Sequence, residues 1–247
     1  MEKSIHPRDR LPLNHPEYRY AESRNPYQAK VRDLRGRVYS DNDTENFKGE
    51  WRKQFVDQAQ HPELKRPVSV EIGCNAGHVI LEWAAQDLST AYIGIDWKFK
   101  PIFRATEKAI KRKIDNLVFL RAHADRLHYM FGNQEIDFLA LYFPDPWPKK
   151  AQLKNRWLTA ERLRQIAPLV KPGGIFHIKT DHLGYFEWME EAIAQVGDLW
   201  EPFEHTRNLH AHHPAPQTLK IPEVTLFEGL FIKDGIQINS VKLRRKN

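Results

Sequence analysis

Short apolar runs alternate with segments of helical periodicity along most of the chain. Apolar runs that predict buried strands lie at Val68–Ile72, Tyr92–Ile95, Val118–Leu120, Ile136–Phe143 and Ile175–Ile178. Helical periodicity lies between and after them, at Val79–Gln86, Ile102–Ile114, Ala160–Val170 and Tyr185–Val196. This alternation is typical of a doubly wound α/β fold, in which helices cover a mostly parallel sheet.

The last apolar segments predict two further strands. Val224–Lys233 and Ile236–Leu243 flank Asp234-Gly235, a pair that favours a tight turn between antiparallel strands. We therefore expect the sheet to finish with antiparallel strands.

Residues 1–66 have a different character. They are rich in charge, show little apolar periodicity, and contain four prolines in the first 26 positions, which favour extended or turn segments. We expect a basic, partly flexible extension with one amphipathic helix, from about Thr44 to Gln60, that places Phe47, Trp51 and Phe55 on one face. Residues 67–247 are then predicted to form one domain.

Composition narrows the class of protein. Of 247 residues 41% are hydrophobic, which suits a globular chain, and the net charge of +6 with a pI near 9.3 favours a polyanionic partner. Cys74 stands alone, which excludes an intramolecular disulfide and fits a reducing compartment. No run approaches the roughly 18 apolar residues that a membrane span needs. We expect a cytoplasmic protein without a membrane partner.

A glycine-containing turn follows the first predicted strand. Gly73 and Gly77 allow a ligand to approach the backbone closely, and Asp96, at the end of the next strand, suits the hydroxyls of a ribose. Asn75 occupies the middle position of G-x-G-x-x-G, which disfavours a dinucleotide. Glu71 suits a cationic ligand such as S-adenosylmethionine, although a structural turn with a buried Glu is the alternative interpretation.

A proline-rich loop follows the strand Ile136–Phe143. Its sequence is Pro144-Asp145-Pro146-Trp147-Pro148-Lys149-Lys150, and the alternating prolines forbid helix. Asp145 is thus presented on a stiff loop at the carboxyl end of a strand, where open α/β sheets bind ligands. Trp147 could stack on a base, and the lysines could contact phosphate. A proline-stiffened surface loop without chemistry is the alternative.

These motifs together resemble the bacterial tRNA (guanine-N7)-methyltransferases, a class I S-adenosylmethionine-dependent family. The resemblance covers roughly residues 67–235. It rests on Glu71-Ile72-Gly73, Ile93-Gly94-Ile95-Asp96, the proline-rich loop with its two lysines, Lys171-Pro172-Gly173-Gly174, Thr180-Asp181 and Thr225-Leu226-Phe227-Glu228.

The resemblance implies a Rossmann-like methyltransferase sheet and methyl transfer from S-adenosylmethionine to N7 of a guanine in tRNA, at guanine 46 of the variable loop. It implies that Asp145 is catalytic and borders both cofactor and guanine. The other cofactor-binding residues would be Glu71, Gly73, Gly77, Asp96 and His123; the substrate-binding residues Lys149, Asp181, Thr225 and Glu228; and the RNA-binding residues Lys150, Lys154 and Arg156. His123 stands where the family has an Asp, so either His123 or Asp125 would face the adenine of the cofactor.

Two other functions remain open. Asp145-Pro146-Trp147 is similar to the Asp-Pro-Pro-aromatic loops of methyltransferases that modify exocyclic amines of DNA or small molecules. The departures at Asn75 and His123 would suit a non-catalytic RNA-binding protein with the same fold. His205, His210, His212 and His213 lack a carboxylate or Cys at ligand spacing, so we expect no metal. Monomer and homodimer are both compatible with the sequence.

Overall fold

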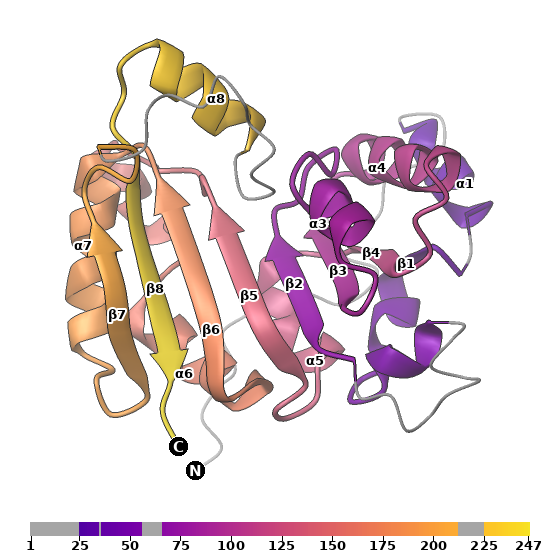
Figure 1. Ribbon diagram of the computed structural model, residues 1–247, viewed down its shortest axis with the longest axis horizontal. Coiled ribbons are helices and arrows are strands. Elements are labelled where there is room, and N and C mark those ends of the chain that lie inside the picture. Colours follow the sequence, from indigo (N-terminus) through magenta and orange to yellow (C-terminus); the bar gives the residue numbers. More distant parts are fainter. Residues whose placement is uncertain (1–24, 35, 56–65, 212–224) are drawn as a thin grey trace. The chain divides into compact units, whose positions relative to one another are not determined.

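The computed structural model describes residues 25–34, 36–55, 66–211 and 225–247 (Figure 1). The chain divides into two compact units, Met1–Gly132 and Asn133–Asn247. Within the described ranges, no helix is both long and apolar enough to cross a membrane.

The first unit contains a parallel sheet with the strand order β1-β4-β3-β2. Every residue of β2 and β4 is buried. Parallel strands covered on both faces have no side that faces solvent, so they are rich in apolar residues, although β2 also buries Ser69 and Glu71 and β4 ends in the buried Arg121. The strands are β1 (Val38–Ser40), β2 (Val68–Ile72), β3 (Ala91–Asp96) and β4 (Leu117–Arg121).

Helices of this unit connect the strands. The longest, α4, buries Phe99, Ile102, Ala105 and Ala109 at three- and four-residue steps, the spacing of one helix face. The α-helices are α1 (Tyr27–Arg32), α3 (Ile80–Gln86), α4 (Phe99–Lys111) and α5 (Leu127–Met130), and the 3₁₀ helices are η1 (Asp41–Glu45), η2 (Trp51–Gln54) and η3 (Ala124–Arg126).

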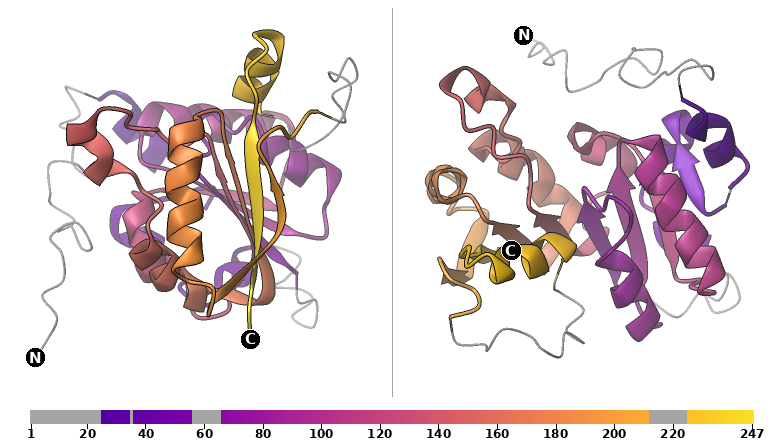
Figure 2. Two further views of the ribbon diagram at one scale, coloured as in Figure 1. Left: turned by 90° about the vertical axis from the view of Figure 1, so that its left-hand side faces the viewer. Right: turned by 90° about the horizontal axis from the view of Figure 1, so that it is seen from above.

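The second unit contains a mixed sheet with the order β5-β6-β8-β7. The strands β5 (Ile136–Tyr142) and β6 (Val170–Thr180) are parallel, and β8 (Asn239–Arg245) pairs antiparallel with both β6 and β7 (Trp200–Thr206). Its helices are η4 (Lys150–Asn155), α6 (Ala160–Ile166), η5 (Ala167–Leu169), α7 (Leu183–Ala194) and α8 (Leu226–Lys233). Helix α8 lies beyond the carboxyl end of β6 (Figures 1 and 2).

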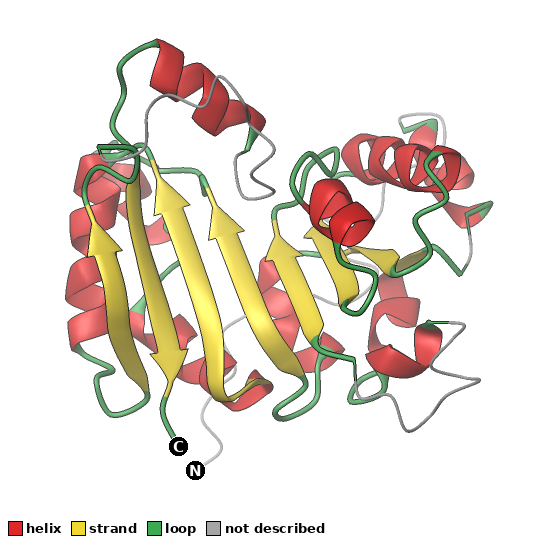
Figure 3. Cartoon of the chain, in the orientation of Figure 1, coloured by secondary structure: helices red, strands yellow, loops and turns green. Residues whose placement is uncertain are grey.

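The distribution of helices and strands along the two units is that of a doubly wound, mostly parallel α/β sheet with antiparallel final strands (Figure 3). The predicted fold class is confirmed. Each predicted strand from Val68 to Ile178 is present. Strand β6 is longer than predicted at both ends, and at its start it includes Lys171-Pro172-Gly173-Gly174.

The predicted strand at Val224–Lys233 is wrong, because Leu226–Lys233 forms helix α8 and Val224 lies outside the described residues. The Thr225 side chain accepts the N–H of Glu228, and the Glu228 side chain accepts the N–H of Thr225, so the two form a capping box. Gly235, at φ +70°, follows the helix and not a hairpin. The strand predicted at Ile236–Leu243 is present as β8. The edge strand β7 was not predicted, because its residues are mostly exposed.

The continuous helix predicted from Thr44 is absent over residues 44–55, and residues 56–60 lie outside the described ranges. Two 3₁₀ helices occur instead, with Gly49 between them at φ +80°, a value that interrupts a right-handed helix. The aromatic residues still pack together, because the Phe47 and Trp51 ring centroids are 5.4 Å apart and Trp51 and Phe55 are buried.

Candidate active site

The predicted glycine turn lies at the carboxyl end of β2. Gly73, Asn75 and Gly77 have positive φ angles of 75°, 48° and 74°. The N–H groups of Gly73 and Cys74 donate to the Ile95 carbonyl at 2.8 and 3.0 Å, which ties the turn to β3. Asn is among the few residues other than Gly that adopt this backbone region readily. The substitution of glycine by Asn75 is therefore compatible with the turn.

The two glycines serve different purposes. A Cβ at Gly77 would lie 2.9 Å from Leu81 Cδ1 and 3.1 Å from Ala105 Cβ, so this glycine is required by close packing. A Cβ at Gly73 would meet nothing within 4 Å. The backbone at Gly73 thus borders open space that a ligand can enter.

Asp96 joins the turn to the end of β3. Its Oδ2 accepts the Asn75 N–H at 3.1 Å, and its Oδ1 accepts the Lys98 N–H at 2.9 Å. Burial raises the pKa of Asp96, and these backbone hydrogen bonds oppose that shift. The carboxylate predicted to bind ribose therefore also holds the glycine turn in place.

A second carboxylate lies at the end of β2. Glu71 is only 4% exposed. Burial raises the pKa of the Cys74 thiol well above its usual value, and the charges of Glu71 and Asp96 add to this effect. Both carboxylates therefore place negative charge beside the turn, which suits a cationic ligand.

His123 and Asp125 follow β4, the parallel neighbour of β3. His123 Nδ1 lies 3.3 Å from the Asp125 backbone nitrogen and 3.2 Å from its Oδ2. The side chain of His123 is 37% exposed, whereas that of Asp125 is 10% exposed. Of the two residues predicted to face an adenine, His123 is the more accessible.

In the second unit, the proline-rich loop leaves the carboxyl end of β5 in an unusual backbone conformation. Phe143 and Trp147, on either side of Asp145, have φ angles of +51° and +43°. The Phe143 N–H donates to the Lys179 carbonyl at 2.8 Å, which anchors the start of the loop to β6. Strained backbone of this kind is concentrated at functional sites. Asp145 is exposed on this loop.

Arg156, which follows the same loop in the sequence, anchors it through a hydrogen bond to Pro146. Its guanidinium donates to the carbonyls of Pro146 and Gly184 at 3.0 and 3.1 Å and lies 4.9 Å from the Tyr185 ring centroid. Arg156 is 8% exposed. This placement favours a structural role over the RNA contact that the sequence suggested. Lys149, Lys150 and Lys154 are exposed, as an RNA contact requires.

Asp181 follows the carboxyl end of β6, next to the end of the parallel strand β5. It is partly exposed and precedes His182, whose Nδ1 accepts the Tyr185 N–H at 3.0 Å and thereby caps α7. Asp145 and Asp181 thus follow adjacent parallel strands at the same edge of the sheet.

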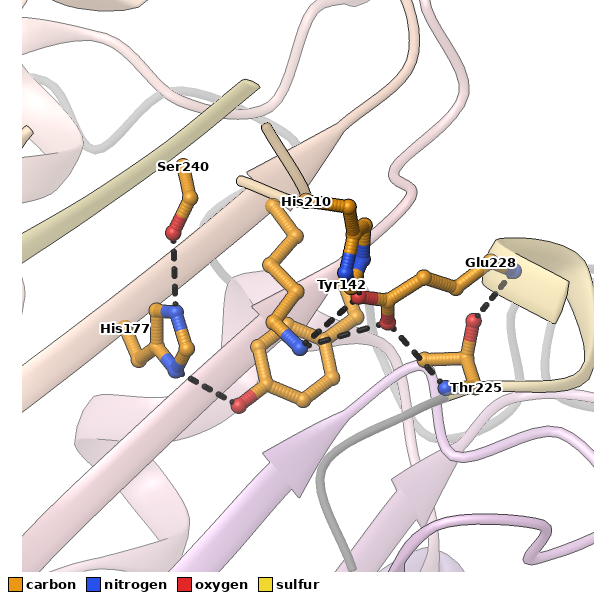
Figure 4. A network of polar contacts seen from close by, with 7 residues as sticks. Tyr142, His177, His210, Thr225, Glu228 and Ser240 are labelled. Carbon is orange, nitrogen blue, oxygen red and sulfur yellow. Dashed lines mark hydrogen bonds and ion pairs between the residues drawn. The ribbon is translucent and has the colours of Figure 1, made fainter. Parts of the chain in front are cut away.

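Glu228 is the centre of a buried polar network (Figure 4). Its side chain has no exposed surface, and Lys179, 2% exposed, lies with Nζ 3.2 Å from Oε2 and 3.4 Å from Oε1. His210 Nε2 is 2.7 Å from Oε1, and the Thr225 N–H donates to Oε2 at 3.2 Å. The predicted substrate-binding residues Thr225 and Glu228 are therefore also structural partners.

Sequence reasoning missed the roles of Lys179 and His210. Lys179 is a cation at the end of an apolar strand, just before Thr180-Asp181, and that position was the available signal. His210 was considered only as a metal ligand.

Tyr142, His177 and Ser240 form a neighbouring network. His177 Nδ1 is 2.8 Å from the Tyr142 hydroxyl, and Nε2 is 3.0 Å from Ser240 Oγ (Figure 4). Burial, together with the charges of Lys179 and Lys242, lowers the pKa of His177 to about 2. His177 is thus neutral, with one ring nitrogen donating and the other accepting.

Across the described ranges, no group of three or more His, Cys, Asp or Glu side chains is arranged to hold a metal ion. His212 and His213, from the histidine group noted in the sequence, lie outside the described residues.

Comparison with known proteins identifies the family. A family model described as putative methyltransferase matches residues 65–239. The tRNA (guanine-N(7)-)-methyltransferase of Bdellovibrio bacteriovorus is 30% identical over 198 residues, which are 80% of this chain and 90% of the relative. Its counterpart in Ureaplasma urealyticum is 32% identical over 209 residues, 83% of this chain and 89% of the relative.

Among solved structures, the 16S rRNA methyltransferase KamB has the same fold, with a TM-score of 0.56 at 18% identity over 78% of this chain and 95% of that one. The sequence relatives confirm the predicted resemblance. The chain belongs to the tRNA (guanine-N7)-methyltransferase family.

Proposed function

We propose that this protein transfers the methyl group of S-adenosylmethionine to N7 of a guanine in tRNA, at guanine 46 of the variable loop. Family membership supports the reaction. The structural observation that supports it most directly is the Asp96–Asn75 hydrogen bond, which joins an open glycine turn to an acidic strand end. That pairing suits a nucleoside ligand.

The residues of the first unit fit the cofactor. The open space at Gly73 admits a ligand to the backbone, and Asp96 retains acceptor sites for ribose hydroxyls, because each carboxylate oxygen has two lone pairs. Glu71 suits the cationic amino and sulfonium groups, and His123 or Asp125 would face the adenine. When bound, S-adenosylmethionine supplies an electrophilic methyl group.

The residues of the second unit suit the guanine. N7 has a free lone pair, so no general base is needed, and the protein must orient the base and stabilise the positive charge that develops on it. Asp145, Asp181 and Glu228 offer carboxylates for the guanine N1–H and amino group, and Lys149 or Thr225 offers a donor for O6. We assign the catalytic role to Asp145.

Exposed lysines supply contacts to RNA phosphates. Lys149, Lys150 and Lys154 lie on or next to η4, which follows the loop that contains Asp145. The net charge of +6 favours a polyanionic substrate. Because tRNA is used in the cytoplasm, the proposal includes that compartment.

The proposal is tested by incubating the purified protein with S-adenosylmethionine and unmodified tRNA, followed by nucleoside mass spectrometry. We expect 7-methylguanosine, and none from a transcript with adenine in place of guanine 46. Methylation of an exocyclic amine would support the alternative chemistry. Cofactor binding by calorimetry distinguishes an enzyme from a non-catalytic RNA-binding protein, since the latter would show no affinity for S-adenosylmethionine.

A further inference from the structure

The carboxylate of Glu228 has no exposed surface and is fully engaged. A carboxylate has about four acceptor sites. Oε1 contacts His210 and Lys179, and Oε2 contacts Lys179 and the Thr225 N–H. A guanine can therefore reach Glu228 only if one of these partners leaves.

Two of the partners are fixed by the fold. Lys179 is 2% exposed on β6, and its Nζ also lies 4.7 Å from the Tyr142 ring centroid. The Thr225 N–H belongs to the capping box that begins α8. Displacing either would require rearrangement of the strand end or of the helix start.

The third partner, His210, lies on the solvent side of the network. Its side chain is 17% exposed, against 2% for Lys179, and it belongs to the turn after β7. The ring reaches Glu228 through a single hydrogen bond of 2.7 Å from Nε2 to Oε1. A rotation of this side chain would break that hydrogen bond and leave the Lys179 and Thr225 contacts of Glu228 in place.

We propose that His210 is a specificity-determining residue that occupies Oε1 of Glu228 in the free protein and is displaced by the N1–H of guanine. The proposal rests on the proposed function and adds to it an exchange step. One N–H donor replaces another at the same oxygen, so the carboxylate never lacks a partner.

The exchange selects guanine because Oε1 of Glu228 requires a hydrogen-bond donor in place of His210. Guanine N1 carries a hydrogen, whereas adenine N1 is an acceptor that would face the carboxylate lone pair. A base that displaces His210 and cannot donate leaves a buried acceptor unsatisfied, and the free-energy cost of that unsatisfied group disfavours adenine.

The first test compares kcat/KM for unmodified tRNA. His210→Ala removes the competitor, so we expect kcat/KM to rise about threefold to tenfold, the equivalent of one net hydrogen bond. His210→Gln keeps an N–H donor and should stay near the wild-type value. The matched control is His205→Ala, because His205 makes a similar 2.6 Å contact with Glu190 on the surface of the same unit, and it should change nothing. A fall in kcat/KM for folded His210→Ala would overturn the proposal.

The second test needs no turnover and no variant. With ¹⁵N-labelled histidine, the Nε2 resonance of His210 in the wild-type protein should shift when a tRNA transcript and S-adenosylhomocysteine are added, and should stay in place with a transcript that has adenine at the target position. An unchanged resonance with bound guanine-containing tRNA would overturn the exchange. Failure of the proposed function gives a different result, the absence of 7-methylguanosine from the wild-type protein.

Discussion

Replacement of Lys179 by methionine would remove the cationic partner of a carboxylate that has no contact with solvent. Lys179→Met preserves most of the volume and the apolar stem of the side chain while it deletes the charge. Glu228 would keep the His210 and Thr225 hydrogen bonds. Its negative charge would remain in a site where neither it nor the lysine is more than 2% exposed.

The geometry of the Lys179–Glu228 pair sets the expected loss in the free energy of unfolding. At 3.2 Å the attraction between unit charges is about 5 kcal/mol for an effective dielectric constant of about 20. Removal of one partner from a buried pair costs about 3–5 kcal/mol, because the remaining charge is uncompensated. Since two hydrogen bonds to Glu228 persist, we expect about 3 kcal/mol, which is a large part of the total stability of a typical domain.

Urea unfolding of four proteins measures this cost: wild type, Lys179→Met, Glu228→Gln and the double variant. The double variant has no uncompensated charge, so its loss should be smaller than the sum of the two single losses by about 2 kcal/mol or more. If the loss of the double variant differs from the sum of the single losses by less than about 0.5 kcal/mol, the two side chains act independently. That result would refute the interpretation of the network as a coupled ion pair.

Four further outcomes are expected. Asp96→Asn should weaken S-adenosylmethionine binding by about tenfold or more in calorimetry, because it loses a charge-assisted acceptor; unchanged affinity would remove Asp96 from the site. Gly77→Ala should lower the free energy of unfolding by at least 1 kcal/mol, owing to its φ of +74° and the 2.9 Å approach to Leu81, and a neutral effect in urea unfolding would contradict this. His177 remains neutral in the folded protein, whereas in the unfolded chain it takes up a proton below about pH 6.5, so the free energy of unfolding should fall as the pH is lowered. Between pH 7 and pH 5 the His177→Gln variant should lose about 2 kcal/mol less of that free energy than the wild type. Parallel pH profiles of the two proteins would refute the assignment. Arg156→Met should reduce methyl transfer through a loosened loop while the salt dependence of tRNA binding stays the same; a flatter salt dependence would instead indicate a phosphate contact.

Local patterns in the sequence were sufficient to predict much of the fold. The runs at Val68–Ile72 and Ile136–Phe143 could be recognised as strands because parallel strands covered on both faces are mostly apolar, although β2 also buries Ser69 and Glu71. The glycine turn and Asp96 were also predictable, because each follows its own strand directly and adjacent parallel strands end at one edge. The roles of these residues toward a cofactor remain predictions.

The segment Leu226–Lys233 shows the limit of apolar patterning. Its residues suit a strand or a helix equally, and the choice depends on the capping pair Thr225 and Glu228, a local signal that the strand prediction passed over. Strand β7 was missed for the opposite reason, since an exposed edge strand has little apolar pattern to detect.

Only the tertiary structure could decide the positions of the buried charges. The resemblance to the methyltransferase family assigned Arg156 to RNA and Glu228 to substrate, and the structure buries both side chains. Charged residues are rarely buried unless they are paired. The fold buries both by supplying partners from distant parts of the chain, and Lys179 lies 49 positions from Glu228. Spacing along a sequence contains no information about such pairs, because they form only where separate strands and helices end at the same place.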